Sequence, residues 1–355
     1  MQHRPHHLVL IAVLLSPMVL PGQELALTGL DPIDLARGEE RAGAADLELP
    51  LGRFRYRFAT ADNLATFRAE PERHAIQFGG ACARMGPLSG AGDPARWLVH
   101  DGRIYVFASD QCRDGFRNQP ARFLDADVPR PPGDPAGAAL LARAVAAHGG
   151  GDRLRAWRTY AHEHRRVEGD TTQVWRLRIA FPERWRTEHD YLQAKQQWHF
   201  ANVVTADAAF SVAQDKTEPM HQSARREATH QLLRDPVVAL RRALDGPHAA
   251  TAVGKTKVGG TAVDRCELWL DGAVVTLGVG ADGRVLTLSC RARGPQLWFG
   301  ALDLAFDDFE SHDGILVPHR VRATFDGKPA PTLDEARQEV AVDAPVDDDQ
   351  FRAAK

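Results

Sequence analysis

The alternation of apolar and polar residues divides the chain into two unlike parts. Before residue 125, short alternating runs such as Phe54, Tyr56 and Phe58 are each followed by a helical pattern, which predicts strand–helix units. From Trp157 onward, alternating runs follow one another across turns, with a helical interruption at about 224–243. The pattern predicts an α+β protein in which a small strand–helix module precedes a long antiparallel sheet with helices.

The strand–helix pattern of the first part occurs twice. The segment from Tyr56 to Arg73 recurs without a gap as the segment from Tyr105 to Arg122. Thr60 and Ser109 precede the two expected helices, where a hydroxyl accepts a hydrogen bond from the first helical turn. We therefore expect two related units, joined by the glycine-rich segment 78–87.

A proline-rich stretch separates the two parts. Residues 128–137 read Val-Pro-Arg-Pro-Pro-Gly-Asp-Pro-Ala-Gly, a composition typical of a stiff linker. A helix is expected at 138–148, and hairpin turns at Asp271-Gly272 and Asp282-Gly283. The predicted domains are residues 24–127 and 138–355.

The N-terminus resembles a secretory signal peptide. A basic start is followed by an apolar run from Leu8 to Leu20 and by Pro21-Gly22. We expect residues 1–23 to be removed and the chain to be periplasmic or secreted, the alternative being an uncleaved anchor. The formal net charge of −3 over 355 residues gives no reason to expect nucleic acid as a partner. No later stretch is long and apolar enough to be expected to cross a membrane.

Four cysteines in an exported chain can form disulfides or bind metal. Their order favours pairing Cys82 with Cys112 and Cys266 with Cys290. However, Cys266 and Cys290 fall two strands apart in the expected sheet, about 9–10 Å, which is too far for a disulfide. We expect these two thiols to be reduced and buried.

Residues 28–124 resemble the secreted form of the YHS domain family. The resemblance rests on an opening Gly-Leu-Asp-Pro at 29–32, the segment 56–73, the loop Phe78-Gly79-Gly80-Ala81-Cys82-Ala83 and the segment 92–105. It implies handling of a soft metal ion, copper in particular, by cysteines at a strand–helix junction. Of the two cysteines in the family pattern, this chain has one, at Cys112.

The cysteines of this module allow two interpretations. Thiolate and thioether ligands select Cu(I), so Cys82, Met85 and Cys112 are a candidate copper or other soft-metal site, to which His74 could add a nitrogen. In an oxidising compartment a Cys82–Cys112 disulfide is the simpler use of the same pair. Unpaired thiols are a third possibility.

Residues 138–351 resemble the periplasmic lipoprotein-carrier type of domain. The resemblance rests on short sequence motifs at 146–154, 181–186 and 306–318. It implies a curved antiparallel half-barrel, closed by helices over a cavity for a lipid or another apolar molecule. Tryptophans are candidates to line that cavity, with ordinary core packing as the alternative; they are Trp175, Trp185, Trp198, Trp269 and Trp298.

Other motifs carry less weight. His162 and His164 would share one face of a strand, but no third ligand is evident, so a solvated polar face is the expectation. No signature of a serine hydrolase, a carboxylate pair or a zinc protease is present, which makes catalysis less expected. The sequence thus predicts an exported, non-catalytic protein that binds a soft metal and an apolar molecule. The alternatives are a structural or interaction protein with a Cys82–Cys112 disulfide, or an unrecognised hydrolase or redox enzyme.

Overall fold

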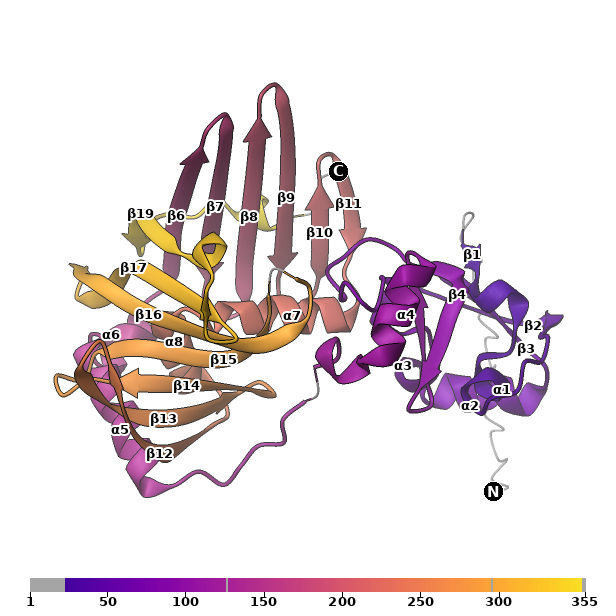
Figure 1. Ribbon diagram of the computed structural model, residues 1–355, viewed down its shortest axis with the longest axis horizontal. Coiled ribbons are helices and arrows are strands. Elements are labelled where there is room, and N and C mark those ends of the chain that lie inside the picture. The colour runs from indigo at the N-terminus through magenta and orange to yellow at the C-terminus, as the bar shows by residue number, and fades with distance from the viewer. Residues whose placement is uncertain (1–22, 126, 295, 353–355) are drawn as a thin grey trace, which may run out of the picture.

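The computed structural model describes residues 23–125, 127–294 and 296–352. The predicted signal peptide lies almost entirely outside these residues. The described chain is a mixed α+β structure dominated by one large antiparallel sheet (Figure 1).

The C-terminal part is built on a 14-stranded sheet whose neighbouring strands are all antiparallel. Its order is β11-β10-β9-β8-β7-β6-β19-β17-β16-β15-β14-β13-β12, with β18 paired to β17. The strands are β6 (Thr159–Glu168), β7 (Thr171–Ala180), β8 (Arg184–Gln193), β9 (Gln196–Val204), β10 (Ala209–Ala213), β11 (Lys216–Pro219), β12 (His248–Val258), β13 (Thr261–Leu270), β14 (Ala273–Val279), β15 (Val285–Arg293), β16 (Phe299–His312), β17 (Ile315–Phe325), β18 (Lys328–Pro329) and β19 (Glu335–Val342).

The sheet bends sharply where β19 meets β17. These two strands pair at only two positions, Arg320 with Ala336 and Val321 with Glu335. Figure 1 shows the consequence: β6 to β11 stand upright, whereas β12 to β17 run across the view. The last strand of the chain therefore joins two groups of strands that are hairpin-connected within themselves.

Helices cover one face of this sheet. They are α5 (Pro135–Ala147), α6 (Gly151–Ala156), α7 (Gln222–Leu232) and α8 (Pro236–Asp245). Asp235 caps α8 by accepting hydrogen bonds from two backbone N–H groups of the first turn, and Pro236 occupies the position where no N–H is needed. The apolar sides of these helices and the inward residues of the strands form one buried cluster, including Leu240, Leu268 and Leu277.

A buried ion pair ties the bend to α8. Arg337 of β19 lies 2.7 Å from Asp235, and both side chains are almost fully buried. The Tyr160 hydroxyl donates a hydrogen bond to the same carboxylate at 3.2 Å. Because each charge has a partner, the pair is tolerated in the core. Loss of one partner would leave the other charge buried and unpaired.

The N-terminal part contains the predicted duplication. Strand β2 (Ala44–Leu51), strand β3 (Phe54–Phe58) and helix α2 (Ala61–Ala69) are followed by β4 (Asp93–His100), β5 (Arg103–Phe107) and α4 (Asp110–Asn118), each 49 residues later. Both hairpins contain a register shift at the same place, after Ala44 in the first and after Asp93 in the second. The remaining elements of this part are β1 (Glu24–Leu25), η1 (Ala26–Gly29), α1 (Pro32–Ala36), α3 (Pro71–His74), η2 (Gln77–Gly80) and η3 (Pro120–Arg122).

The predicted helix caps are confirmed. Thr60 accepts a hydrogen bond from the Asn63 N–H, and Ser109 accepts one from the Cys112 N–H, at 3.1 and 3.2 Å. The two units have separate apolar clusters, one around Phe58 and Phe67 and one around Cys82, Phe107 and Phe116.

The predicted linker is shorter than expected. Helix α5 begins at Pro135 rather than at residue 138, because Asp134 accepts a hydrogen bond from the Gly137 N–H and caps the helix. The residues before α5 are held against the sheet. The Val128 N–H donates a hydrogen bond to the Gly272 carbonyl, and the Val128 carbonyl accepts one from the Trp269 ring N–H. The linker therefore packs along the hairpin between β13 and β14.

The two parts contact each other through polar and aromatic side chains. Arg293 of β15 pairs with Glu227 of α7 at 3.1 Å and donates a hydrogen bond to the Phe123 carbonyl. The Arg122 guanidinium lies 4.8 Å from the centre of the Trp298 ring. Trp298 thereby packs against the apolar clusters of both parts.

Candidate functional site

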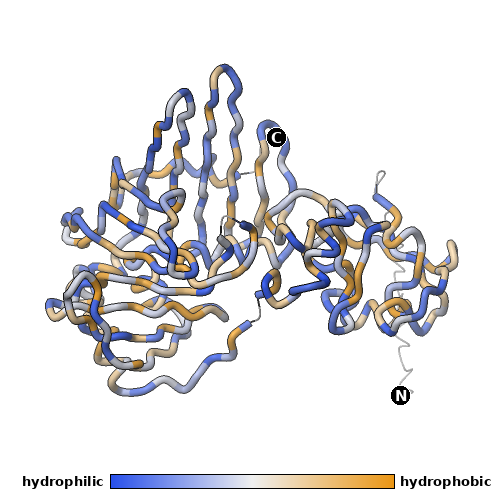
Figure 2. The backbone as a smooth tube through the Cα atoms, in the orientation of Figure 1, coloured by the Kyte–Doolittle hydropathy of each residue, from blue (hydrophilic) through white to orange (hydrophobic). Residues whose placement is uncertain are grey.

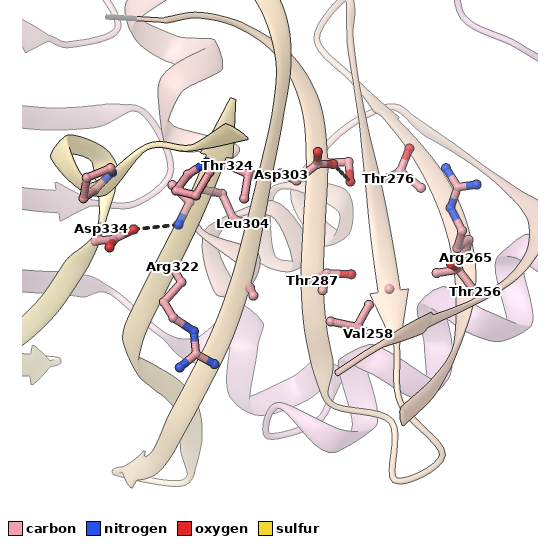
Figure 3. Close-up of a pocket in the computed structure, with 16 residues that line it drawn as sticks. Thr256, Val258, Arg265, Thr276, Thr287, Asp303, Leu304, Arg322, Thr324 and Asp334 are labelled. Atoms are coloured by element: carbon pink, nitrogen blue, oxygen red, sulfur yellow. Dashed lines mark hydrogen bonds between the residues drawn. The ribbon is translucent and has the colours of Figure 1, made fainter. Parts of the chain in front are cut away.

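A groove lies on the face of β12–β17 that the helices leave uncovered, which we call the open face. Its volume is about 640 Å³. Figure 3 shows the residues that line it on the strands, with helices behind them. The groove residues are Thr256, Val258, Arg265, Thr276, Gly278, Thr287, Ser289, Asp303, Leu304, Ala305, Arg322, Ala323, Thr324, Pro329, Pro331 and Asp334.

Strand alternation places the groove opposite the core. On β14, Leu277 is buried against the helices, and its neighbours Thr276 and Gly278 point the other way. The floor is one row of paired positions across four strand pairs, from Arg265 through Gly278, Thr287 and Ala305 to Arg322. Small residues thus occupy the middle of the row and arginines occupy its two ends, about 19 Å apart along the sheet.

Gly278, in the middle of the floor, leaves room for the Thr287 side chain. A Cβ atom there would lie 2.1 Å from the Thr287 hydroxyl oxygen, so that hydroxyl occupies the space a larger residue would take. The adjacent row contributes hydroxyls from Thr276 and Ser289, and Ser289 donates a hydrogen bond to Asp303 at 2.6 Å. The floor therefore combines methyl groups with hydrogen-bonding atoms.

Two segments form the walls. The far half of β12 turns over the sheet after a register shift between Ala252 and Lys255, which brings Thr256 and Val258 to the groove. The opposite wall is the segment after β17, where Asp334 accepts a hydrogen bond from the Ala323 N–H at 2.7 Å. Figure 3 shows this bond as a dashed line.

The two arginines of the groove differ in their partners. Arg322 lies 3.5 Å from Asp307. Arg265 is half-buried and has no hydrogen-bond acceptor or ion-pair partner within the part of the chain that the structure describes. By contrast, Arg176 and Arg186 on the upright strands pair with Asp190 and Glu188.

The five tryptophans proposed to line a cavity lie outside this groove. The structure does not bring them together. Trp185 is buried in the core, Trp175 stacks on His189 at 4.7 Å, and Trp198 packs on Tyr191. Trp269 contacts the linker and Trp298 the N-terminal part. Small and hydroxyl residues at alternate positions of adjacent strands line the groove instead, and the same pattern is common on solvent-exposed strand faces.

The predicted thiol pair does come together. Cys82 and Cys112 are both free, and each packs in the apolar cluster around Phe116. Burial raises the pKa of the Cys82 thiol more than backbone hydrogen bonds at Ala108 and Met85 lower it, and the neighbouring Cys112 thiol raises it further. A thiol–disulfide exchange or a bridging ion would involve both sulfurs at once.

The first unit has a polar pair at the matching place. The buried Asp31 carboxylate accepts hydrogen bonds from the Ala59 N–H at 2.6 Å and from the Asn63 side-chain amide at 2.8 Å. It also accepts one from the Ile33 N–H and thereby caps α1. All of these bonds satisfy donors that would otherwise be buried without a partner.

In the second unit, sulfur replaces these polar groups. The Cys82 N–H bonds to the Gly90 carbonyl as the Asp31 N–H bonds to the Arg41 carbonyl, and Cys112 is 49 residues after Asn63. Cys82 and Cys112 therefore stand where the first unit has a hydrogen-bonded carboxylate and amide. The duplication shows that the fold does not require cysteine at this place.

Of the two remaining predicted ligands, Met85 lies with the thiols and His74 does not. Met85 packs in the same cluster as the two cysteines, and its N–H donates to the Cys82 carbonyl at 2.9 Å. His74 lies at the end of α3 in the first unit, and no contact with either thiol is present among the described residues. Two thiols and a thioether fit a soft ion, and the histidine does not belong to that set.

The two cysteines of the sheet lie as predicted, two strands apart. Cys266 pairs with Leu277 on β14, and Cys290 pairs with Val275 on the same strand. Both are free; Cys266 is fully buried and Cys290 is half-buried. Burial raises the pKa of the Cys266 thiol to about 11.

The expectation of a solvated face for His162 and His164 is wrong. The two do share a face, but it is the helix-covered one, since His164 is level with the buried Arg337. Desolvation lowers the pKa of His162 to about 3, assisted by the nearby Arg337 guanidinium. This histidine is held neutral in the folded chain.

Comparison with known proteins gives fold similarity only. No protein-family model matches the chain, and no curated protein matches it. Among solved structures, a domain assigned to outer membrane lipoprotein sorting from Vibrio parahaemolyticus aligns at 10% identity over 61% of this chain and 96% of that chain, with a TM-score of 0.38. A DUF1329 family protein from Desulfovibrio piger aligns at 13% identity over 61% and 97%, with a TM-score of 0.32. A LolA superfamily protein from Nitrosomonas europaea aligns at 10% identity over 61% and 97%, with a TM-score of 0.32.

Within the described residues, no helix is long and apolar enough to cross a membrane.

Proposed function

We propose that this chain is an exported binding protein that holds one amphipathic lipid with an anionic head in the groove of the open face. The groove volume of about 640 Å³ is in the range of small-ligand sites. The helix-covered side of the sheet is filled by side chains of the core, so the open face is the side that offers space. Figure 2 illustrates how apolar and polar positions alternate along the strands.

The floor suits an acyl chain. Gly278, Thr287 and Ala305 present backbone and methyl groups in one row, and Val258 and Pro329 add apolar surface from the walls. Burial of apolar surface contributes about 25 cal/mol per Å². An extended chain lying across the strands would cover this row.

The observation that carries the proposal is the unpaired Arg265 at one end of that row. A guanidinium that lacks an acceptor in the protein can bind a carboxylate or phosphate through two parallel hydrogen bonds. The head group would then lie at Arg265 and the acyl chain would point toward Ala305.

The test is displacement of a fluorescent long-chain fatty acid from the purified chain. We compare the wild type with Arg265→Gln and with Arg155→Gln, which removes an exposed arginine of α6 outside the groove. We expect Arg265→Gln to weaken binding tenfold or more, as loss of a charge-assisted hydrogen bond does, and Arg155→Gln to leave it unchanged. Equal affinities for all three chains, or no binding by the wild type, would overturn the proposal.

The thiol pair supports a second candidate function. We propose that Cys82 and Cys112 hold a soft metal ion such as Cu(I), with Met85 as a third sulfur. The alternative is a disulfide, in which the two thiols lose two protons and two electrons to an exported thiol oxidant.

Intact mass spectrometry separates the two. A metal site predicts a retained ion that is lost in Cys82→Ser and kept in His74→Gln. A disulfide predicts a mass lower by two hydrogens and no retained ion. The Cys266→Ser variant is the matched control, because that thiol lies in the other part of the molecule.

A further inference from the structure

A second cluster of metal-ligating side chains lies on the β16–β17 hairpin, away from both sites described above. It consists of Glu310, His312 and His319, whose ligand atoms all lie within 4.8 Å of one another. The Nε2 atoms of the two histidines are 2.8 Å apart, and the His319 Nε2 lies 3.8 Å from a Glu310 oxygen. Three potential ligands therefore converge on one point.

The bend of the sheet creates this arrangement. Strands β17 and β19 pair no further than Arg320 with Ala336, and His319 is the next residue of β17 beyond this pair. Its Nδ1 lies 3.3 Å from the Arg337 carbonyl oxygen, which can only accept a hydrogen bond. Nδ1 therefore carries the proton, and the lone pair of Nε2 is directed at the cluster.

This is the arrangement found in histidines that bind metals. Such a histidine donates its other ring N–H to a carbonyl or carboxylate, which fixes the tautomer and the ring orientation. The His312 ring lies nearly parallel to that of His319, with an interplanar angle of 19°. With Nδ1 of His319 protonated, the 2.8 Å contact is a hydrogen bond that the His312 Nε2–H donates to the His319 Nε2. A metal ion would take the place of this proton, which moves to the His312 Nδ1 or to solvent.

We propose that Glu310, His312 and His319 form a binding site for a divalent transition-metal ion of the Zn²⁺ type. Two imidazoles and one carboxylate are a ligand set that suits zinc, whereas calcium and magnesium prefer oxygen ligands throughout. Three protein ligands leave a fourth position for water, because the Glu310 side chain is largely exposed and solvent reaches the cluster. The two nitrogens would separate slightly to accommodate the ion.

The experiment is a ZnCl₂ titration followed by isothermal calorimetry, on the full chain produced without a histidine tag. A Cys82→Ser/Cys112→Ser background removes the thiols as competing ligands. In that background we expect one high-affinity site. His312→Gln should weaken it about 100-fold, and Glu310→Gln about tenfold.

Two variants keep the result interpretable. His199→Gln is the matched control, since His199 also lies beside a carboxylate, Asp190 at 2.7 Å, but has no second histidine. Glu310 is exposed, so Glu310→Gln tests the site without disturbing the fold. Absence of a saturable site in the background, or equal affinity in His312→Gln and His199→Gln, would overturn the proposal.

Discussion

On strand β14, Val275, Leu277 and Val279 face the helices and are buried, whereas Thr276 and Gly278 between them line the groove. The same strand therefore serves a packed face and an open face. On the packed face, large aliphatic side chains fill the volume between the sheet and the helices. On the open face, small and hydroxyl side chains leave the groove open. The difference separates residues that stabilise the fold from residues that shape a site.

The strongest test of this comparison uses two adjacent residues. Leu277→Ala removes a fully buried side chain and should lower the free energy of unfolding by about 2–5 kcal/mol. Thr276→Ala, one residue away on the open face, should change it by less than about 1 kcal/mol. Urea denaturation followed by circular dichroism measures both, and similar losses would show that the two faces are not distinct.

The packed face should also impose a pH dependence. The pKa of His162 is lowered to about 3 in the folded chain, from an ordinary value near 6.5. Below pH 6.5, His162 binds a proton in the unfolded chain but not in the folded chain. The free energy of unfolding therefore falls as the pH drops toward 3. The slope from this group is at most about 1.4 kcal/mol per pH unit.

His162→Gln isolates this contribution. Its free energy of unfolding should fall less steeply than that of the wild type between pH 6.5 and pH 4. Above pH 8, where His162 is neutral in both states, the difference between the two chains should be constant. Parallel curves over the whole range would contradict a neutral His162 in the folded chain.

The smallest expected effect on stability is on the open face. Ala305→Trp places a large ring on the groove floor, where Ala305 is half-buried and faces away from the core. We expect a change in unfolding free energy of about 0.5 kcal/mol or less. Fatty-acid affinity should fall tenfold or more because the ring fills the space for the acyl chain. A large loss of stability with unchanged affinity would reverse the assignment of the two faces.

Much of the fold was predictable because it is local. The succession of strands after Trp157 was predicted, since the alternation and flanking turns of each strand lie within ten residues or so. The duplication was visible as a constant offset. Strand β19 was missed because its partners, β17 and β6, are joined to it only by long-range pairing. Strands β2, β4 and β12 were missed as well.

The candidate sites were less predictable. The order of the cysteines favoured the pair Cys82–Cys112, but the correspondence of Cys82 with Asp31 was not predictable. These two residues are 51 positions apart, whereas the repeated strands are 49 positions apart. The groove has no sequence signature, since threonine, glycine and alanine on alternate strand positions are also ordinary surface residues. Only the strand register brings Arg265 and Ala305 into one row.

The most direct test of lipid binding on the open face is a crystal structure of the chain with a long-chain fatty acid brominated along its acyl chain. Anomalous scattering locates the bromine atoms without assumptions about the binding mode. We predict bromine peaks over Thr287 and Ala305, with the carboxylate at hydrogen-bonding distance from Arg265. Peaks between helix α8 and the sheet, or an empty groove in the presence of excess fatty acid, would contradict the account.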